Sequence, residues 1–113
     1  MTLRARRRVR PAGNVRLWID APDGLIHARG RIFDLSEGGC ELRLHRGVDA
    51  QLAGRISVRI GGREVWLPVI TRCAHEDTHG WTVGCTFERP TREQAHAIRA
   101  LLLEWRRSGP EPA

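Results

Sequence analysis

The chain has 113 residues, enough for one domain with its own core and too few for two. Its formal net charge is +6 and all 19 basic residues are arginine, so we expect an anionic partner such as a nucleotide, a nucleic acid or a membrane surface. The three cysteines are an odd number, which argues against a disulfide framework. The charged N-terminus has no apolar run behind it, which argues against a secretory signal, and no stretch of about 18 apolar residues could span a membrane. Together these features favour a cytoplasmic location.

The first 13 residues are an arginine-rich arm without apolar periodicity. Such a segment buries too little surface to offset its own ordering entropy, so we expect the arm to be flexible. It ends in Pro11 and Gly13, which separate it from the patterned sequence that begins at residue 14.

Residues 14–88 alternate apolar and polar side chains in six short runs, which is the pattern of half-buried strands. We expect turns at residues 20–24, 34–39 and 75–80, and a hairpin turn at Gly61 and Gly62. The residues on the apolar side of these runs are Val15, Leu17, Ile19, Ile26, Ala28, Gly30, Ile32, Cys40, Leu42, Leu44, Ile56, Val58, Ile60, Val65, Leu67, Val69, Trp81, Val83, Cys85 and Phe87. This spacing predicts an all-β fold, a six-stranded antiparallel β-barrel.

The last element is predicted to be a C-terminal α-helix. Thr91 is suited to the N-cap, and Gln94 three residues later completes a capping box. Gly109 and Pro110 should end the helix, so we expect the barrel and helix to span residues 14–107 and residues 108–113 to be a disordered tail. The apolar residues on one helical face are Ala95, Ile98, Leu102 and Trp105.

Two short patterns could bind a ligand. In the arm, Arg6 and Arg10 have an R-x-x-x-R spacing, and Arg4 and Arg8 have the same spacing. Arg7 could also contribute to ligand binding. Guanidinium groups on such an arm can close on a phosphodiester and stack on a purine. A solvated basic tail or a nonspecific nucleic-acid arm would look the same.

The second pattern is a D-x-S-x-x-G turn formed by Asp34, Ser36 and Gly39. It places a carboxylate and a hydroxyl at a strand end, and Gly38 and Gly39 beside them let a flat ligand approach the backbone. The carboxylate can accept hydrogen bonds from a guanine edge. Asp, Ser and Gly are also the residues of an ordinary turn, so this pattern alone is weak.

Together the two patterns resemble the PilZ domain family, in which R-x-x-x-R on an N-terminal arm precedes [D/N]-x-S-x-x-G after the second strand. A Trp-x-x-Gly-x-x-Phe run at Trp81, Gly84 and Phe87 and the terminal helix extend the resemblance over roughly residues 4–105. The resemblance implies a six-stranded barrel with a helix and a binding site for the bacterial second messenger cyclic di-GMP.

The site residues that this resemblance implies are Arg6, Arg7, Arg10, Asp34, Ser36, Gly38 and Gly39. The arginines would hold the phosphates and stack on guanine, and Asp34 and Ser36 would contact the guanine edges. The expected protein is a receptor without catalytic activity that regulates a downstream partner, in processes such as motility and biofilm formation. The sequence also leaves open the alternative that the ligand holds two copies of the chain together as a dimer.

Two other functions stay open from the residues: an adaptor of the pilus or motility apparatus that ignores nucleotide, and a basic nucleic-acid-binding module. Cys73, His75 and His79 superficially resemble metal ligands, but their spacing matches no common zinc pattern, so we expect no metal. No Ser/His/Asp set can be assembled from the sequence, which argues against an enzyme.

Overall fold

The computed structural model describes residues 14–60, 62–78 and 80–107, with side chains up to residue 104. The expected arm and tail lie outside these residues. The elements are β1 (Asn14–Ala21), β2 (Gly24–Leu35), β3 (Gly39–Leu44), β4 (Ala53–Ile60), β5 (Arg63–Asp77), β6 (Gly80–Phe87) and α1 (Arg92–Arg107).

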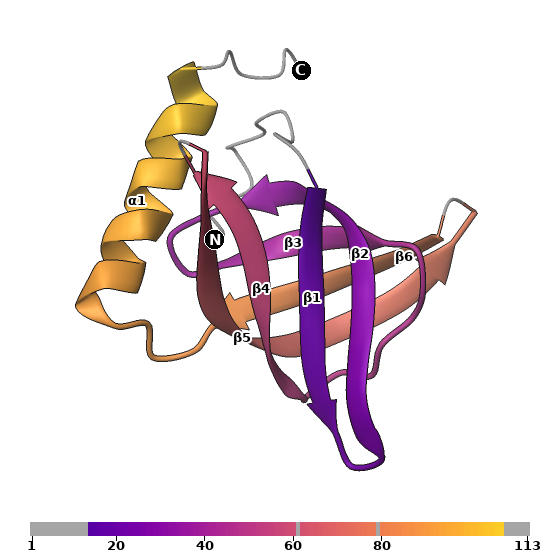
Figure 1. The fold of residues 1–113 in the computed structure, drawn as a ribbon. Coiled ribbons are helices and arrows are strands. Elements are labelled where there is room, and N and C mark those ends of the chain that lie inside the picture. The colour runs from indigo at the N-terminus through magenta and orange to yellow at the C-terminus, as the bar shows by residue number, and fades with distance from the viewer. Residues whose placement is uncertain (1–13, 61, 79, 108–113) are drawn as a thin grey trace.

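The six strands form a closed barrel in the order β1-β2-β3-β6-β5-β4 (Figure 1). Every neighbouring pair is antiparallel, and the pairing of β1 with β4 closes the ring. Closure satisfies the backbone hydrogen bonds that an open sheet would leave exposed at its edges. The predicted all-β, six-stranded antiparallel barrel with a C-terminal helix is confirmed.

The barrel interior is filled by the alternating apolar residues of all six strands. Leu17, Ile56 and Leu67 are fully buried, whereas the residues before them in sequence, Arg16, Arg55 and Trp66, are exposed. The remaining core residues of the barrel and its loops are Val15, Ile19, Ala28, Ile32, Leu35, Cys40, Leu42, Leu44, Val48, Val58, Val69, Val83 and Cys85. The alternation of buried and exposed residues along each strand is the same two-residue period from which the strands were predicted.

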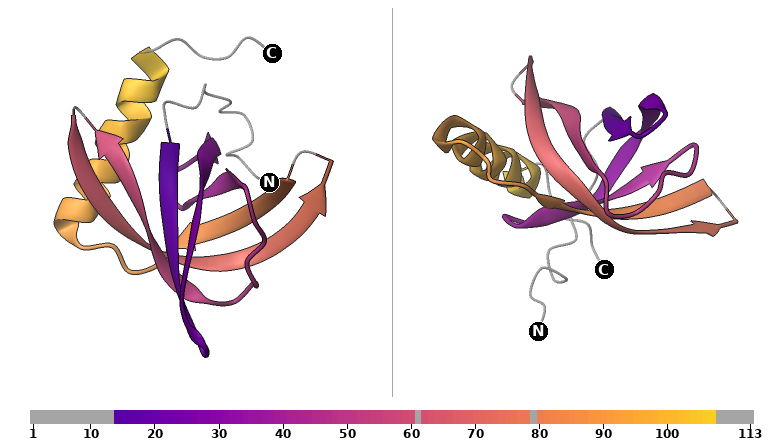
Figure 2. Two further views of the ribbon diagram at one scale, coloured as in Figure 1. Left: turned by 45° about the vertical axis from the view of Figure 1, so that its right-hand side comes forward. Right: turned by 90° about the horizontal axis from the view of Figure 1, so that it is seen from below.

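Helix α1 lies beside the β4–β5 hairpin (Figures 1 and 2). Its buried residues Ile98, Leu101 and Leu102 belong to the same hydrophobic cluster as the barrel core. Ile98 and Leu102 were predicted on this face, while the side chain of Trp105 lies outside the described part of the chain. In the ranges that the structure describes, no helix is long and apolar enough to cross a membrane.

The helix begins with the predicted capping box. The backbone N–H of Gln94 donates to Thr91 Oγ1 at 3.0 Å, and the Thr91 N–H donates to Gln94 Oε1 at 2.8 Å. Gln94 Nε2 also donates to the Trp66 carbonyl at 3.2 Å. The cap therefore both starts α1 and fastens it to β5.

Three predicted turns are shorter than expected. In the turn predicted at residues 20–24, Asp20 and Ala21 belong to β1 and Gly24 to β2, so only residues 22 and 23 connect these strands. Asp34 belongs to β2 and Gly39 to β3, so only residues 36–38 connect these strands. The loop predicted at residues 75–80 is also wrong, because β5 continues to Asp77 and His75 pairs with Thr82 of β6. Ladder hydrogen bonds to a long partner strand outweigh the turn preference of single residues.

Candidate ligand-binding site

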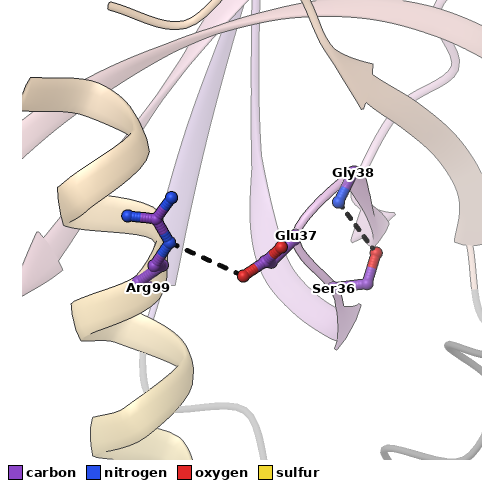
Figure 3. A network of polar contacts seen from close by, with 4 residues as sticks. All are labelled: Ser36, Glu37, Gly38 and Arg99. Carbon is purple, nitrogen blue, oxygen red and sulfur yellow. Dashed lines mark hydrogen bonds and ion pairs between the residues drawn. The ribbon is translucent and has the colours of Figure 1, made fainter. Parts of the chain in front are cut away.

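The motif loop, residues 36–38, is held by its own serine. Its backbone N–H donates to the Gly39 carbonyl at 2.9 Å, and the Gly38 N–H donates to Ser36 Oγ at 3.3 Å (Figure 3). The Ser36 hydroxyl can in turn donate to the Gly39 carbonyl at 3.3 Å. Ser36 thus fixes the shape of the loop, while its half-buried hydroxyl stays at the surface.

A β-bulge in β2 turns two consecutive side chains outward. Ile32 pairs with Leu42 and Asp34 with Glu41, so Phe33 is the additional residue. Without a bulge, residues 32 and 35 would face opposite sides, yet Ile32 and Leu35 are both buried. Phe33 and Asp34 therefore both lie on the outer face, immediately before the motif loop.

Asp34 has the surroundings of a binding residue. Its Oδ1 is buried from solvent and has no hydrogen-bond partner among the residues that the structure describes. Its directly paired residue, Glu41 on β3, shares the outer face and carries the same charge. Unsatisfied buried oxygens and directly opposed like charges both destabilise a fold, so this arrangement favours a ligand that brings hydrogen-bond donors.

The two glycines of the motif have different surroundings. A Cβ atom on Gly39 would lie 2.2 Å from the Cys85 carbonyl oxygen, so the close approach of β3 and β6 requires glycine there. A Cβ on Gly38 would meet nothing within 4 Å. The open space of the site is therefore above Gly38, and Gly39 has a packing role that the motif alone does not show.

A hollow of about 490 Å³ lies on the outer face beside the bulge. The guanidinium of Arg43 stacks over the Phe33 ring, 4.3 Å from its centroid, and Arg31 pairs directly with Arg43 across the strands. Such a surface can bind an anion that also carries flat rings. The hollow is lined by Arg29, Gly30, Arg31, Ile32, Phe33, Arg43, Leu44 and His45.

The motif loop also contacts the helix. Glu37 Oε2 and Arg99 Nε are 3.6 Å apart, and both side chains are well exposed (Figure 3). An exposed pair of this kind contributes little stability. Its importance is its position, because it joins the loop that carries Ser36 to α1.

The structure brings together four of the seven predicted site residues: Asp34, Ser36, Gly38 and Gly39. Arg6, Arg7 and Arg10, like the alternative pair Arg4 and Arg8, lie outside the described residues. Sequence reasoning missed Phe33, Glu41, Arg31 and Arg43. Glu41 and Arg43 could have been found, since they are the outward residues of the alternating run that follows the motif.

Only two of the three residues that superficially resemble metal ligands fall among the described residues. Cys73 and His75 are exposed residues of β5, and His79 lies outside the described residues. No group of three metal-binding side chains occurs among the described residues. All three cysteines are free thiols in the structure.

The closed barrel, with a hydrogen-bonded loop and a basic hollow on its outer face, defines a small β-barrel domain with a candidate ligand site. A family model described as "PilZ domain" matches residues 3–104, and the chain belongs to this family. No curated protein matches the sequence significantly.

Solved structures share the fold at low sequence identity. The PilZ domain of YcgR from Escherichia coli, with c-di-GMP, is 15% identical with a TM-score of 0.71, covering 90% of this chain and 89% of that one. The PilZ domain of CeSA from a cellulose-synthesizing bacterium is 19% identical with a TM-score of 0.61, covering 81% and 92%. The Bacillus subtilis inhibitor of motility, MotI/DgrA, is 15% identical with a TM-score of 0.63, and the match covers 92% of this chain and 52% of that one.

Proposed function

We propose that the chain is a cytoplasmic receptor for cyclic di-GMP without catalytic activity of its own. The observation that carries the proposal is Asp34 Oδ1, a carboxylate oxygen that is buried from solvent and finds no hydrogen-bond partner in the described part of the chain. The edge of guanine presents N–H donors, including its exocyclic amino group. A guanine base would therefore supply the donors that the protein itself does not. The similarity to a PilZ domain whose structure contains c-di-GMP supports this ligand.

The remaining motif residues have complementary roles in this proposal. Ser36 would contact guanine through its hydroxyl while its hydrogen bond from Gly38 keeps the loop in shape. The open space above Gly38 admits a flat ring close to the backbone. The arm arginines Arg6 and Arg10 would hold the phosphates from the opposite side and stack on the bases, with Arg7 available as a third cation.

Binding would change the surface of the protein. The arm is the segment that ligand would fold onto the barrel, and this creates a new surface for a downstream protein or for a second copy of the chain. The free energy for the change is the difference in ligand affinity between the two arm positions. Because Glu37 of the motif loop contacts Arg99 of α1, a ligand-induced movement of this loop would also reach the helix.

Isothermal titration calorimetry with cyclic di-GMP tests the proposal, with GTP and cyclic AMP as control ligands. We expect micromolar or tighter binding of cyclic di-GMP alone, and a loss of about 10-fold or more in Asp34→Ala. Asp23→Ala, an equal change in the exposed β1–β2 turn, should bind normally. Absence of binding by the folded wild-type chain would overturn the proposal and leave the nucleotide-independent adaptor as the better explanation.

The arm is tested by charge reversal. Arg10→Glu should abolish binding, whereas Arg107→Glu, which changes the net charge equally at the end of α1, should not. Hydrogen exchange should show amides of residues 5–12 becoming protected when cyclic di-GMP is added. Equal exchange with and without saturating ligand would show that the arm is not the clamp.

A further inference from the structure

Five exposed arginines lie on four adjacent strands of the outer barrel surface, which we term the basic face. Four of them pair directly in the sheet: Arg16 of β1 lies opposite Arg29 of β2, and Arg31 of β2 lies opposite Arg43 of β3. The strands β3, β2, β1 and β4 are neighbours, and β4, β1 and β2 can be followed side by side in Figure 1. The basic face consists of Arg16, Arg29, Arg31, Arg43 and Arg55.

The basic face is unfavourable for the fold. Like charges directly opposite one another on neighbouring strands destabilise a sheet, and here two such pairs adjoin. No described carboxylate forms an ion pair with any of the five arginines. The pKa of His27 is lowered, first by burial and then by the charges of Arg16, Arg29 and His45. Within the described residues, the surface therefore has a positive potential that no ion pair offsets.

Aromatic rings lie among these arginines. At one end, Arg43 stacks on Phe33 at 4.3 Å, and at the other the guanidinium of Arg55 lies 5.5 Å from the Trp66 ring centroid. Both rings are notably exposed for their size, at 36% and 39%. A guanidinium plane laid on a ring presents its other side to a further flat group.

The centre of the face is also flat and aromatic. Trp18 and His27, which pair directly across β1 and β2, stack with their ring centroids 4.1 Å apart and 28° between the planes. Trp18 Nε1 and His27 Nε2 are buried and have no hydrogen-bond partner within the described ranges. The face thus alternates cations with flat groups from β3 to β5.

We propose that the basic face binds single-stranded nucleic acid, a function beyond cyclic di-GMP recognition. From Arg43 to Arg55 the face crosses four strands, about 14 Å at the usual strand spacing, so it can contact several successive phosphates. Interleaved aromatic rings and arginines suit unstacked bases, which is how barrel surfaces bind single strands. The helix that the structure describes, α1, packs beside β4 and β5, and exposed stacking rings suit unpaired bases, so a single strand fits better than a duplex.

The basic face overlaps the candidate cyclic di-GMP site at Arg31, Phe33 and Arg43, but its far side can be tested separately. Arg16 and Arg55 lie on β1 and β4, whereas the motif residues Asp34 and Ser36 end β2 and follow it. Fluorescence anisotropy with a labelled oligothymidine of about 15 nucleotides, and with a duplex of equal length, tests the proposal in the full chain. Calorimetry with cyclic di-GMP is run on the same variants, so that failure of one site does not obscure the other.

The expected salt dependence is quantitative. Five phosphate contacts give a slope of log K against log salt of about −3.5 for a single strand, so affinity should fall roughly 100-fold between about 50 and 200 mM salt. The double variant Arg16→Gln/Arg55→Gln should reduce the slope to about −2.1 and weaken binding, with cyclic di-GMP binding unchanged. Arg72→Gln/Arg89→Gln, which removes the same charge from β5 and from the segment after β6, is the matched control.

Each outcome decides the proposal. Binding to the single strand that weakens in the Arg16/Arg55 variant and not in the control supports it. No binding at low salt, equal losses in both double variants, tighter binding to the duplex, or equal binding of a polyglutamate peptide would each overturn it. Circular dichroism of every variant confirms that the barrel is intact.

Discussion

Gly38 and Gly39 are neighbours in the chain, yet a methyl group added to each should have opposite effects on stability. At Gly39 the new Cβ would lie 2.2 Å from the Cys85 carbonyl oxygen, whereas contacts of 3.4–4 Å are ordinary. At Gly38 nothing lies within 4 Å. Neither residue has a positive φ, so alanine suits the local backbone at both positions. The comparison therefore isolates the close approach of β3 to β6.

The magnitude follows from what Gly39→Ala must move. The two strands would have to separate by more than an ångström, which overpacks the ladder at about 1–3 kcal/mol. Weakening of the hydrogen bond from the Phe87 N–H to the Gly38 carbonyl, 2.9 Å long, adds about 1 kcal/mol. A total of about 2–4 kcal/mol lowers Tm by roughly 8–32 °C in a domain of this size. Gly38→Ala should raise stability by about 0.4–1 kcal/mol, because it restricts only the unfolded chain.

Thermal unfolding by circular dichroism measures both variants, and calorimetry of the folded Gly38→Ala protein asks whether the added methyl group hinders cyclic di-GMP. If Gly39→Ala melts within about 2 °C of the wild type, the β3–β6 contact is not what requires glycine. If Gly38→Ala lowers Tm more than Gly39→Ala does, then Gly38 is the packed position of the motif and Gly39 the open one, which contradicts the reasoning.

Three further predictions concern single side chains. Asp34→Ala should keep or raise Tm, because it removes an unpaired buried oxygen; a clear fall in Tm would show that the carboxylate supports the fold. The pKa of the His27 imidazole lies below its ordinary value of 6.5 in the folded protein. The unfolded chain therefore binds a proton at His27 more tightly than the folded chain does, and the free energy of unfolding should fall as the pH drops below about 6.5. His27→Gln should flatten that part of the Tm–pH curve, and an unaltered curve would contradict the shift. Thr91→Ala should cost about 1 kcal/mol through loss of its hydrogen bond from the Gln94 N–H, and an unchanged Tm would mean that the cap is dispensable.

The fold could be predicted because its two strongest signals are local. Runs such as residues 40–44 and 65–69 alternate between core and solvent, and Thr91 and Gln94 identify the helix start within four residues. The end of β5 could not be predicted in this way. His75 and Asp77 are extended because β6 lies alongside them, and the identity of the partner strand is not contained in the short run itself.

The candidate site could be predicted only in part, because some of its features are local in sequence and others depend on how two strands pair. Asp34 and Ser36 stand in a recognisable pattern, but the bulge that turns Phe33 outward depends on the register between β2 and β3. The opposition of Asp34 and Glu41 is likewise a property of two strands rather than of one. The packing role of Gly39 depends on β6, more than forty residues further along the chain.

The way in which the barrel closes has a consequence for how it can open. β1 pairs with β4 at only four described positions, from Arg16–Ser57 to Ile19–Gly54, whereas β1 pairs with β2 at eight. The ring therefore has a seam, and local opening in proteins starts where the fewest hydrogen bonds must break. We expect the β1–β2 hairpin to swing as a flap about its junction with β3. The arm is attached to the first strand of that flap, so a pull on the arm would act on the seam.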